Sequence, residues 1–174
     1  MSVVPSISTI GYEGIAFESF VAALTANGVL QVIDVRELPL SRRKGFSKTA
    51  ISLELSNVGI KYVHLKSLGD PKEGRLAARA GRDAEFRKIF SKHMKSKEAQ
   101  VGLELCAALA TSKPSALLCF ERCPTCCHRG IVAEALRLNY GFSVQHIYAL
   151  STPHGRVDPR GSYRSRQSGS ASRS

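Results

Sequence analysis

The stretch SISTIGYEGIAFESFVAALTANGVLQVIDVR, residues 6–36, decides the fold. Residues 6–12 form a short apolar run with β-branched side chains, which predicts a buried strand. In residues 15–28 the apolar side chains follow the spacing of an amphipathic helix, and Asn27-Gly28 is a stop signal. Residues 30–36 are largely aliphatic and end at charged residues, which predicts a second buried strand. The stretch therefore predicts a strand, a helix and a strand.

The same alternation continues along the chain. We expect a short helix over residues 48–60 and a third strand over 60–65, and this order implies parallel strands joined by helical crossovers. Residues 70–82 contain a proline, two glycines and several basic residues, and we expect them to form an exposed insertion. The remaining expected elements are helices over 83–94, 98–111 and 130–141 and strands over 115–121 and 142–149. The fold class is therefore α/β, a three-layer Rossmann-like open sheet, mostly parallel, with helices on both faces.

The length of 174 residues indicates one α/β domain over residues 1–150. After residue 150 the composition turns to Ser, Arg, Gly and Pro, and we expect residues 151–174 to be a disordered basic tail. No apolar run is long enough to cross a membrane, and the first residues lack the pattern of a secretory signal. We therefore expect a cytoplasmic protein without a membrane partner.

The chain is basic, with a formal net charge of +11. Five arginines and one aspartate follow residue 150, so +4 of this charge lies in the tail and +7 lies within residues 1–150. The excess favours anionic partners, either a phosphorylated small molecule or nucleic acid.

Candidate functional residues gather where the predicted strands end. In open α/β sheets ligands bind at the C-terminal ends of the strands, where helix N-termini also favour anions. The segment CFERCPTCCHRG, residues 119–130, occupies such a place between a strand and a helix. Residues 11–13, 34–36 and 68–70 also follow strands, so all four segments can line one cleft.

Three chemistries fit the cysteines of this segment. Cys123 and Arg129 have the spacing of a thiolate loop that wraps an anion. A zinc site is the second reading, and its ligands would be Cys123, Cys126, Cys127 and His128. The third is a redox dithiol of Cys123 and Cys126. Cys106 is expected to be a core residue.

The chain also resembles a known family. The motifs are IGY (10–12), IDVRELPLSRRKGFSK (33–48), IKYVHLKSLGDP (60–71), LLCFE (117–121) and CHRGIVAEAL (127–136). In this order they resemble the family called domain of unknown function 488, over roughly residues 6–149. The resemblance implies an enzyme without a defined substrate or cofactor, and it includes neither Cys123 nor Cys126 among the recurring residues. It therefore directs attention to Cys119, Glu121, Cys127, His128 and Arg129.

We assign expected roles to these residues and to those at the other strand ends. Cys127 or Cys119 would be the nucleophile and His128 the acid or base, oriented by Glu121 or Asp34. The expected substrate-binding residues carry charge, hydroxyl groups or an aromatic ring: Tyr12, Arg36, Ser41, Arg42, Phe46, Tyr62 and Arg129. Phe46 lies in a basic loop over residues 42–48, where it would either stack on a base or pack into the core.

Two functions remain open on the sequence alone. The first is an enzyme, a hydrolase or transferase, that acts on an anionic, phosphate-bearing or nucleic-acid-related substrate. The second is a non-catalytic nucleic-acid or nucleotide-binding module that uses the basic loop and the tail. We expect no cofactor, with the zinc-binding cysteine cluster as the alternative.

Overall fold

The computed structural model describes residues 4–150, and the predicted disorder of the tail concerns residues outside this range. Five strands form one parallel sheet in the order β3-β2-β4-β1-β5. Their bounds are Ser6–Gly11 for β1, Gln31–Asp34 for β2, Lys61–His64 for β3, Ser115–Cys119 for β4 and Ser143–Ile147 for β5. The prediction of an open α/β sheet is confirmed, and every strand pair is parallel.

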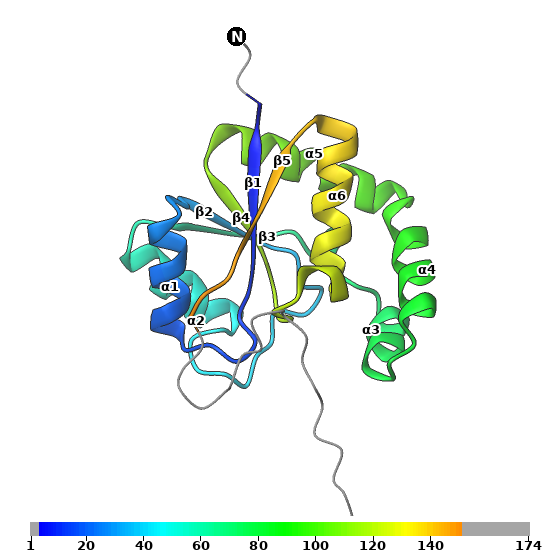
Figure 1. Ribbon diagram of the computed structural model, residues 1–174, viewed down its shortest axis with the longest axis horizontal. Coiled ribbons are helices and arrows are strands. Elements are labelled where there is room, and N and C mark those ends of the chain that lie inside the picture. Colours follow the sequence, from blue (N-terminus) through cyan, green and yellow to red (C-terminus); the bar gives the residue numbers. More distant parts are fainter. Residues whose placement is uncertain (1–3, 151–174) are drawn as a thin grey trace, which may run out of the picture.

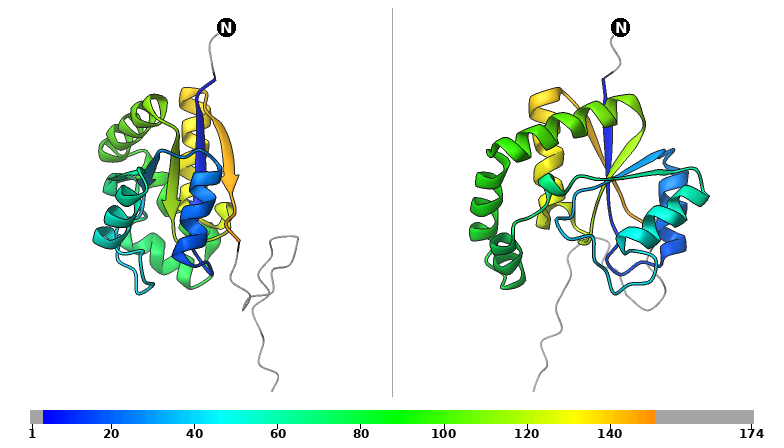
Figure 2. Two further views of the ribbon diagram at one scale, coloured as in Figure 1. Left: turned by 90° about the vertical axis from the view of Figure 1, so that its left-hand side faces the viewer. Right: turned by 180° about the vertical axis from the view of Figure 1, so that it is seen from behind.

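Helices cover both faces of the sheet (Figure 1). One face packs against α1 (Phe17–Ala26) and α2 (Lys48–Asn57), as the core that contains Phe20, Val32 and Leu55 shows. The other face packs against α5 (Lys97–Ser112) and α6 (His128–Tyr140), with α3 (Lys72–Arg79) and α4 (Asp83–Met94) beside them (Figure 2). Two short 3₁₀ turns, η1 (Lys66–Leu68) and η2 (Pro124–Cys126), complete the elements. The three layers explain why the central strands are apolar on both sides.

The sheet order creates the crevice in which a site can form. The chain runs from β1 through α1 to β2, but β4 returns later and inserts between these two strands. Helices therefore leave β1 and β4 toward opposite faces of the sheet, which is the switch point at which α/β proteins bind ligands. The C-terminal ends of β1, β2 and β4 lie side by side there, because Gly11 pairs with Cys119 and Asp34 with Leu118.

The segment over residues 70–82 differs from the prediction. It contains helix α3, in which Gly74 and Ala77 are buried. Pro71 directly precedes the helix, a position that needs no backbone N–H, and Gly74 allows close approach to Asp70, since a Cβ there would lie 2.0 Å from Asp70 Oδ1. Pro71 and Gly74 are typical helix breakers, but here Pro71 is the N-cap of the helix and Gly74 allows the helix to pack against Asp70.

None of the helices over residues 4–150 is both long and apolar enough to cross a membrane.

Candidate active site

A cavity of about 520 Å³ opens at the C-terminal ends of β1, β2 and β4. Its walls come from the segments after these strands, the loop before α2 and helix α3. The lining residues are Tyr12, Arg36, Glu37, Leu38, Leu40, Ser41, Arg42, Arg43, Asp70, Arg75, Ala78, Arg79, Cys119, Phe120, Glu121, Cys126 and His128. A hollow of similar volume, about 530 Å³, lies over α5 and η1, but no cysteine, histidine or arginine lines it. The converging reactive groups therefore single out the first cavity as the candidate site.

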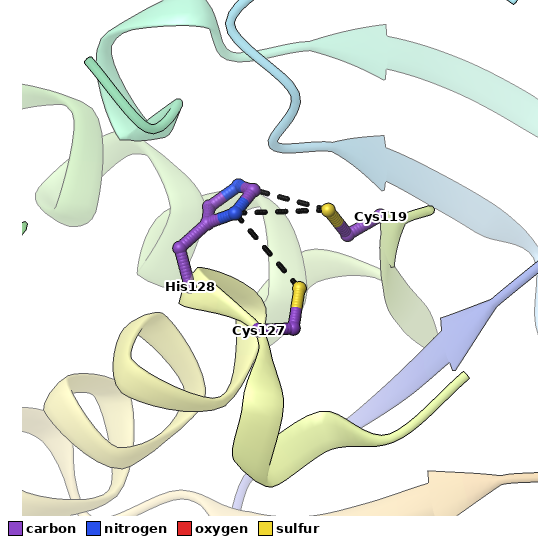
Figure 3. A group of neighbouring side chains, drawn as sticks. All are labelled: Cys119, Cys127 and His128. Atoms are coloured by element: carbon purple, nitrogen blue, oxygen red, sulfur yellow. Dashed lines mark hydrogen bonds between the residues drawn. The ribbon is translucent and has the colours of Figure 1, made fainter. Parts of the chain in front are cut away.

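The floor of the cavity carries Cys119, Glu121 and His128, with Cys127 next to them, and Figure 3 shows the sulfur atoms and the imidazole facing one another. Cys119 is the last residue of β4, and its Sγ lies 3.1 Å from Glu121 Oε2. Cys127 is the N-cap of α6, and its Sγ lies 3.8 Å from His128 Nδ1. Cys119 and His128 line the cavity, whereas Cys127 lies behind them. The sequence predicted that these four residues would lie near one another, and the fold brings them together.

The His128 ring has a fixed orientation. Its Nε2 lies 2.8 Å from the Val35 carbonyl oxygen, which can only accept, so Nε2 carries a proton. Phe90 packs edge-on against the ring, with 5.3 Å between the ring centroids. Cys119 Sγ lies 3.6 Å from Nδ1 and 3.9 Å from Nε2, so it is nearly equidistant from the two nitrogens.

The charges on the floor favour a thiolate on Cys119. Burial alone raises the pKa of Cys119, but the hydrogen bond from Cys127 and the charge of His128 outweigh it and lower this pKa well below its ordinary value. Burial and the neighbouring Cys119 raise the pKa of Cys127 well above its ordinary value. Burial opposes the charged form of His128, but the charge of Cys119 prevails and raises its pKa to about 9. The favoured state is a thiolate on Cys119 beside an imidazolium on His128.

The pKa of Glu121 is shifted toward its protonated form. Burial raises its pKa, and so does the negative charge of Cys119. A protonated Glu121 carboxyl would donate to the Cys119 sulfur across the 3.1 Å contact. The pair can therefore keep a nucleophile and a proton donor side by side.

Arg129 was predicted to clamp an anion, but its guanidinium lies beneath the loop after β4. Its NH1 donates to the Glu121 carbonyl oxygen at 2.6 Å and its NH2 donates to the Arg122 carbonyl oxygen at 3.2 Å. The residue is 1% exposed and does not line the cavity. Gly11 makes room for this arrangement, because a Cβ there would lie 1.9 Å from the Glu121 oxygen. Arg129 thus positions the backbone that carries Glu121.

Asp34 was predicted to take part in acid or base chemistry, but it is fully buried and does not line the cavity. Its Oδ2 accepts hydrogen bonds at 2.6 Å from both Arg36 NH2 and Tyr62 Oη. The remaining Arg36 contacts include the Tyr12 hydroxyl at 2.9 Å and the Phe46 carbonyl oxygen at 3.0 Å. Asp34 therefore fixes the position of Arg36, which lines the cavity. Tyr62 donates to Asp34 and does not line the cavity.

Phe46 is a core residue and does not line the cavity, so of the two placements that the sequence left open, packing into the core is the one observed and stacking on a base is not. The ring is 1% exposed and stacks on Tyr12, with centroids 4.2 Å apart and planes inclined by 9°. The Tyr12 ring is therefore also covered on that side, although Tyr12 itself lines the cavity.

The cavity wall carries five arginines, from two separate segments: Arg36, Arg42, Arg43, Arg75 and Arg79. Three of them have partners: Arg36 pairs with Asp34, Arg75 with Glu37, and Arg43 donates to the Ile15 carbonyl oxygen. Within residues 4–150, Arg42 and Arg79 form no ion pair, and both are exposed. Two guanidinium groups are thus left to meet an anionic ligand. Ser41, also predicted, lines the cavity beside them.

The sequence reasoning missed the contribution of α3. Asp70, Arg75 and Arg79 all line the cavity, together with Glu37. Asp70 did stand out as a polar residue after a strand, but the segment that follows it was expected to be an exposed insertion.

Cys123 and Cys126 do not join the buried sulfur atoms. Cys123 is partly exposed, with its Sγ 3.0 Å from Thr125 Oγ1, and Cys126 is exposed at the cavity rim. Among the described residues, the group with metal-ligand spacing is Cys119, Cys127 and His128, whose ligand atoms lie within 4.8 Å of one another. The predicted zinc set that included Cys123 and Cys126 is therefore not assembled, and the Cys123–Arg129 loop does not form a thiolate cradle.

The model of the family described as "Domain of unknown function DUF488" matches residues 16–136. This match covers well over half of the 174 residues, so the chain belongs to this family, as the motifs indicated. No curated protein and no solved structure matches the chain.

Proposed function

We propose that this member of the DUF488 family is an enzyme, a hydrolase or transferase, that uses Cys119 as a nucleophile on an anionic, phosphate-bearing substrate. One observation carries the proposal: a cysteine whose pKa is lowered well below its ordinary value lies at the floor of a cavity whose wall holds two arginines that form no ion pair within residues 4–150. A nucleophile and the means to bind an anion thus occur within one cavity of about 520 Å³.

Each residue has a role in this mechanism. Arg42 and Arg79 bind the negative groups of the substrate, which places its electrophilic atom near Cys119. The sulfur forms a bond to that atom, and the leaving group departs with the proton that Glu121 holds. Water or an acceptor then displaces the sulfur and returns a proton to Glu121, so that both groups are restored. His128 stabilises the thiolate before and after the reaction, and Val35 fixes the orientation of its ring.

Zinc is the second candidate for the floor, supported by the close spacing of Cys119, Cys127 and His128. Ideal tetrahedral zinc would place a sulfur and a nitrogen ligand about 3.6 Å apart. Both sulfur atoms have about this distance to His128 Nδ1, at 3.6 and 3.8 Å. However, Cys119 Sγ is nearly equidistant from both ring nitrogens, so it does not lie near the line along which Nδ1 would bind a metal. We therefore prefer the thiolate.

Turnover and binding, measured on the same variants, test the proposal. Phosphate monoesters, nucleotides and single-stranded oligonucleotides form the substrate panel, and sulfate serves as a binding probe. Cys119→Ser should abolish turnover and keep sulfate affinity, because only the attacking atom changes. Cys123→Ser is the matched control and should keep both. Turnover that survives Cys119→Ser would contradict the proposal, and binding that falls steeply with salt without any turnover would favour a binding module.

Metal analysis separates the two candidates for the floor. We expect less than stoichiometric zinc in the full chain, and its level should not depend on Cys119. Stoichiometric zinc that is lost in Cys119→Ser but kept in Cys123→Ser would show that the floor is a metal centre and that Cys119 is a ligand and not a nucleophile.

A further inference from the structure

Asp70 is a buried carboxyl group in the cavity wall to which the mechanism above assigns no role. The residue is 5% exposed, and its Oδ1 has no hydrogen-bond partner among the residues of the described part of the chain. A buried carboxylate oxygen without a partner is costly, because it has lost its water and gained nothing in return. Such a group in a binding cavity needs an explanation.

The fold holds this carboxyl firmly in place. Gly69 before it lies against the backbone of Glu37, since a Cβ at Gly69 would lie 2.3 Å from the Glu37 nitrogen. The Asp70 carbonyl oxygen accepts a hydrogen bond from Arg75 NH1 at 2.6 Å. On the side-chain side, Gly74 of α3 provides the space that Oδ1 occupies. Two glycines and one arginine thus fix a carboxyl whose Oδ1 is buried against α3 without a partner in the described part of the chain, which leaves Oδ2 to contact a ligand.

The charges around Asp70 come from four other parts of the fold. His128 of α6, Arg75 of α3 and His93 of α4 favour its ionised form, whereas Glu121 of the loop after β4 opposes it. Burial outweighs all of these and raises the pKa of Asp70 to about 6. The carboxyl is therefore neutral in mildly acidic solution and can then donate a hydrogen bond.

We infer that Asp70 is a further ligand-contacting residue, whose neutral carboxyl donates a hydrogen bond to an oxygen of the anion bound between Arg42 and Arg79. The inference rests on the proposed function for the anion itself and adds the group that recognises its oxygen atoms. In this arrangement the arginines supply charge, and Asp70 supplies a donor that is lost when it ionises. The site therefore takes an oxyanion best when Asp70 is protonated.

Sulfate is a suitable probe, because it is an oxyanion that keeps its charge between pH 5 and 8. Calorimetric titration of the full chain over this range should show affinity that falls about tenfold as pH rises through about 6, since a hydrogen bond to a charged group is replaced by repulsion. Asp70→Asn removes the titration but keeps a donor of the same shape. Its affinity at pH 7.5 should match the wild-type affinity at pH 5 within about twofold, with little change across the range.

Two variants control for neighbouring charged groups, Glu121 and His93. Glu121→Gln and His93→Gln should each keep the pH dependence, because the titrating group is Asp70. Thermal melting confirms that each variant folds. If Asp70→Asn does not fold, ¹³C NMR of the wild-type carboxyl decides the question, since the Asp70 signal should titrate near pH 6 and shift when sulfate is added.

The outcomes separate this inference from the proposed function. A wild-type affinity that does not change with pH, or a pH dependence that survives Asp70→Asn, overturns the role of Asp70 but leaves the anion site. If the pH dependence of sulfate affinity is lost only in Glu121→Gln or only in His93→Gln, the replaced residue is the titrating group. That result also overturns the role of Asp70. Absence of sulfate binding at every pH overturns the anion site itself, and with it the proposed function.

Discussion

Replacement of Asp34 by asparagine should destabilise the fold strongly and leave the cavity chemistry in place. The Asp34 carboxylate is fully buried and accepts three side-chain hydrogen bonds from Arg36, at 2.6 to 3.1 Å, and one from Tyr62 at 2.6 Å. Arg36 itself is 5% exposed, so asparagine would leave a buried guanidinium without its counter-charge. Loss of one partner of a buried ion pair costs about 3–5 kcal/mol.

This magnitude is large relative to the stability of a domain. Folded domains are typically stable by about 5–15 kcal/mol, so the variant would lose about a third or more of a mid-range value. For a chain of this length each kcal/mol lowers the melting temperature by about 2–4 °C, which predicts a fall of roughly 6–20 °C. Tyr62→Phe removes a single hydrogen bond to the carboxylate and should cost less, about 1.5–3 kcal/mol.

Equilibrium unfolding in urea measures these differences, with thermal melting as the second readout. Glu134→Gln is the matched control, because it removes an exposed carboxylate that pairs with Arg137 on the surface of α6 and should change little. Sulfate affinity of the folded Asp34→Asn protein should not fall, since Asp34 does not line the cavity and Arg36, which does, loses only its counter-charge. A stability loss below about 1 kcal/mol, or one no larger than that of Tyr62→Phe, would refute the reasoning.

Two further predictions concern the backbone under the site and the thiols. Gly11→Ala should lower both stability and Cys119-dependent turnover, because the new Cβ would collide with the Glu121 carbonyl oxygen, to which Arg129 donates. Turnover and a melting curve measure the two effects, and unchanged turnover would contradict this prediction. Alkylation mapped by mass spectrometry should depend less on pH between 7 and 9 at Cys119, whose pKa is lowered well below its ordinary value, than at Cys126, whose pKa is raised. Cys106 should stay unmodified in the folded protein, because burial raises its pKa to about 12, and its early modification would show that the core is open.

The sheet and most of its helices could be predicted from the sequence because each has a strong local signal. Apolar runs ending in charged residues marked β2 and β4, and regular spacing of apolar residues marked α1. Helix α3 lacked such a signal, since Pro71 and Gly74 are typical breakers and only its contact with Asp70 explains the glycine. What the sequence missed was therefore set by tertiary packing.

The candidate site was predictable in part for a similar reason. The ends of parallel strands must meet at one edge of a sheet, so the meeting of Cys119, Glu121 and His128 followed from their positions. The direction of a long side chain does not follow from position. Arg129 could have turned into the cavity or under the loop, and the close approach at Gly11 decides for the loop. Asp34 likewise follows a strand as expected, but its neighbours Arg36 and Tyr62 use its carboxylate.

The central claim is that Cys119 is a thiolate in a cavity that attracts anions, and competition between two alkylating reagents tests it most directly. Iodoacetate carries a negative charge and iodoacetamide is neutral, but they are otherwise similar in size and reactivity. The ratio of their rates, measured at Cys119 and at the partly exposed Cys123, which does not line the cavity, should favour iodoacetate at Cys119 alone. In the Arg42→Gln/Arg79→Gln variant that preference should fall to the level of Cys123. A Cys119 that neither reagent modifies, or one with the same ratio as Cys123 in the wild-type protein, would contradict the account.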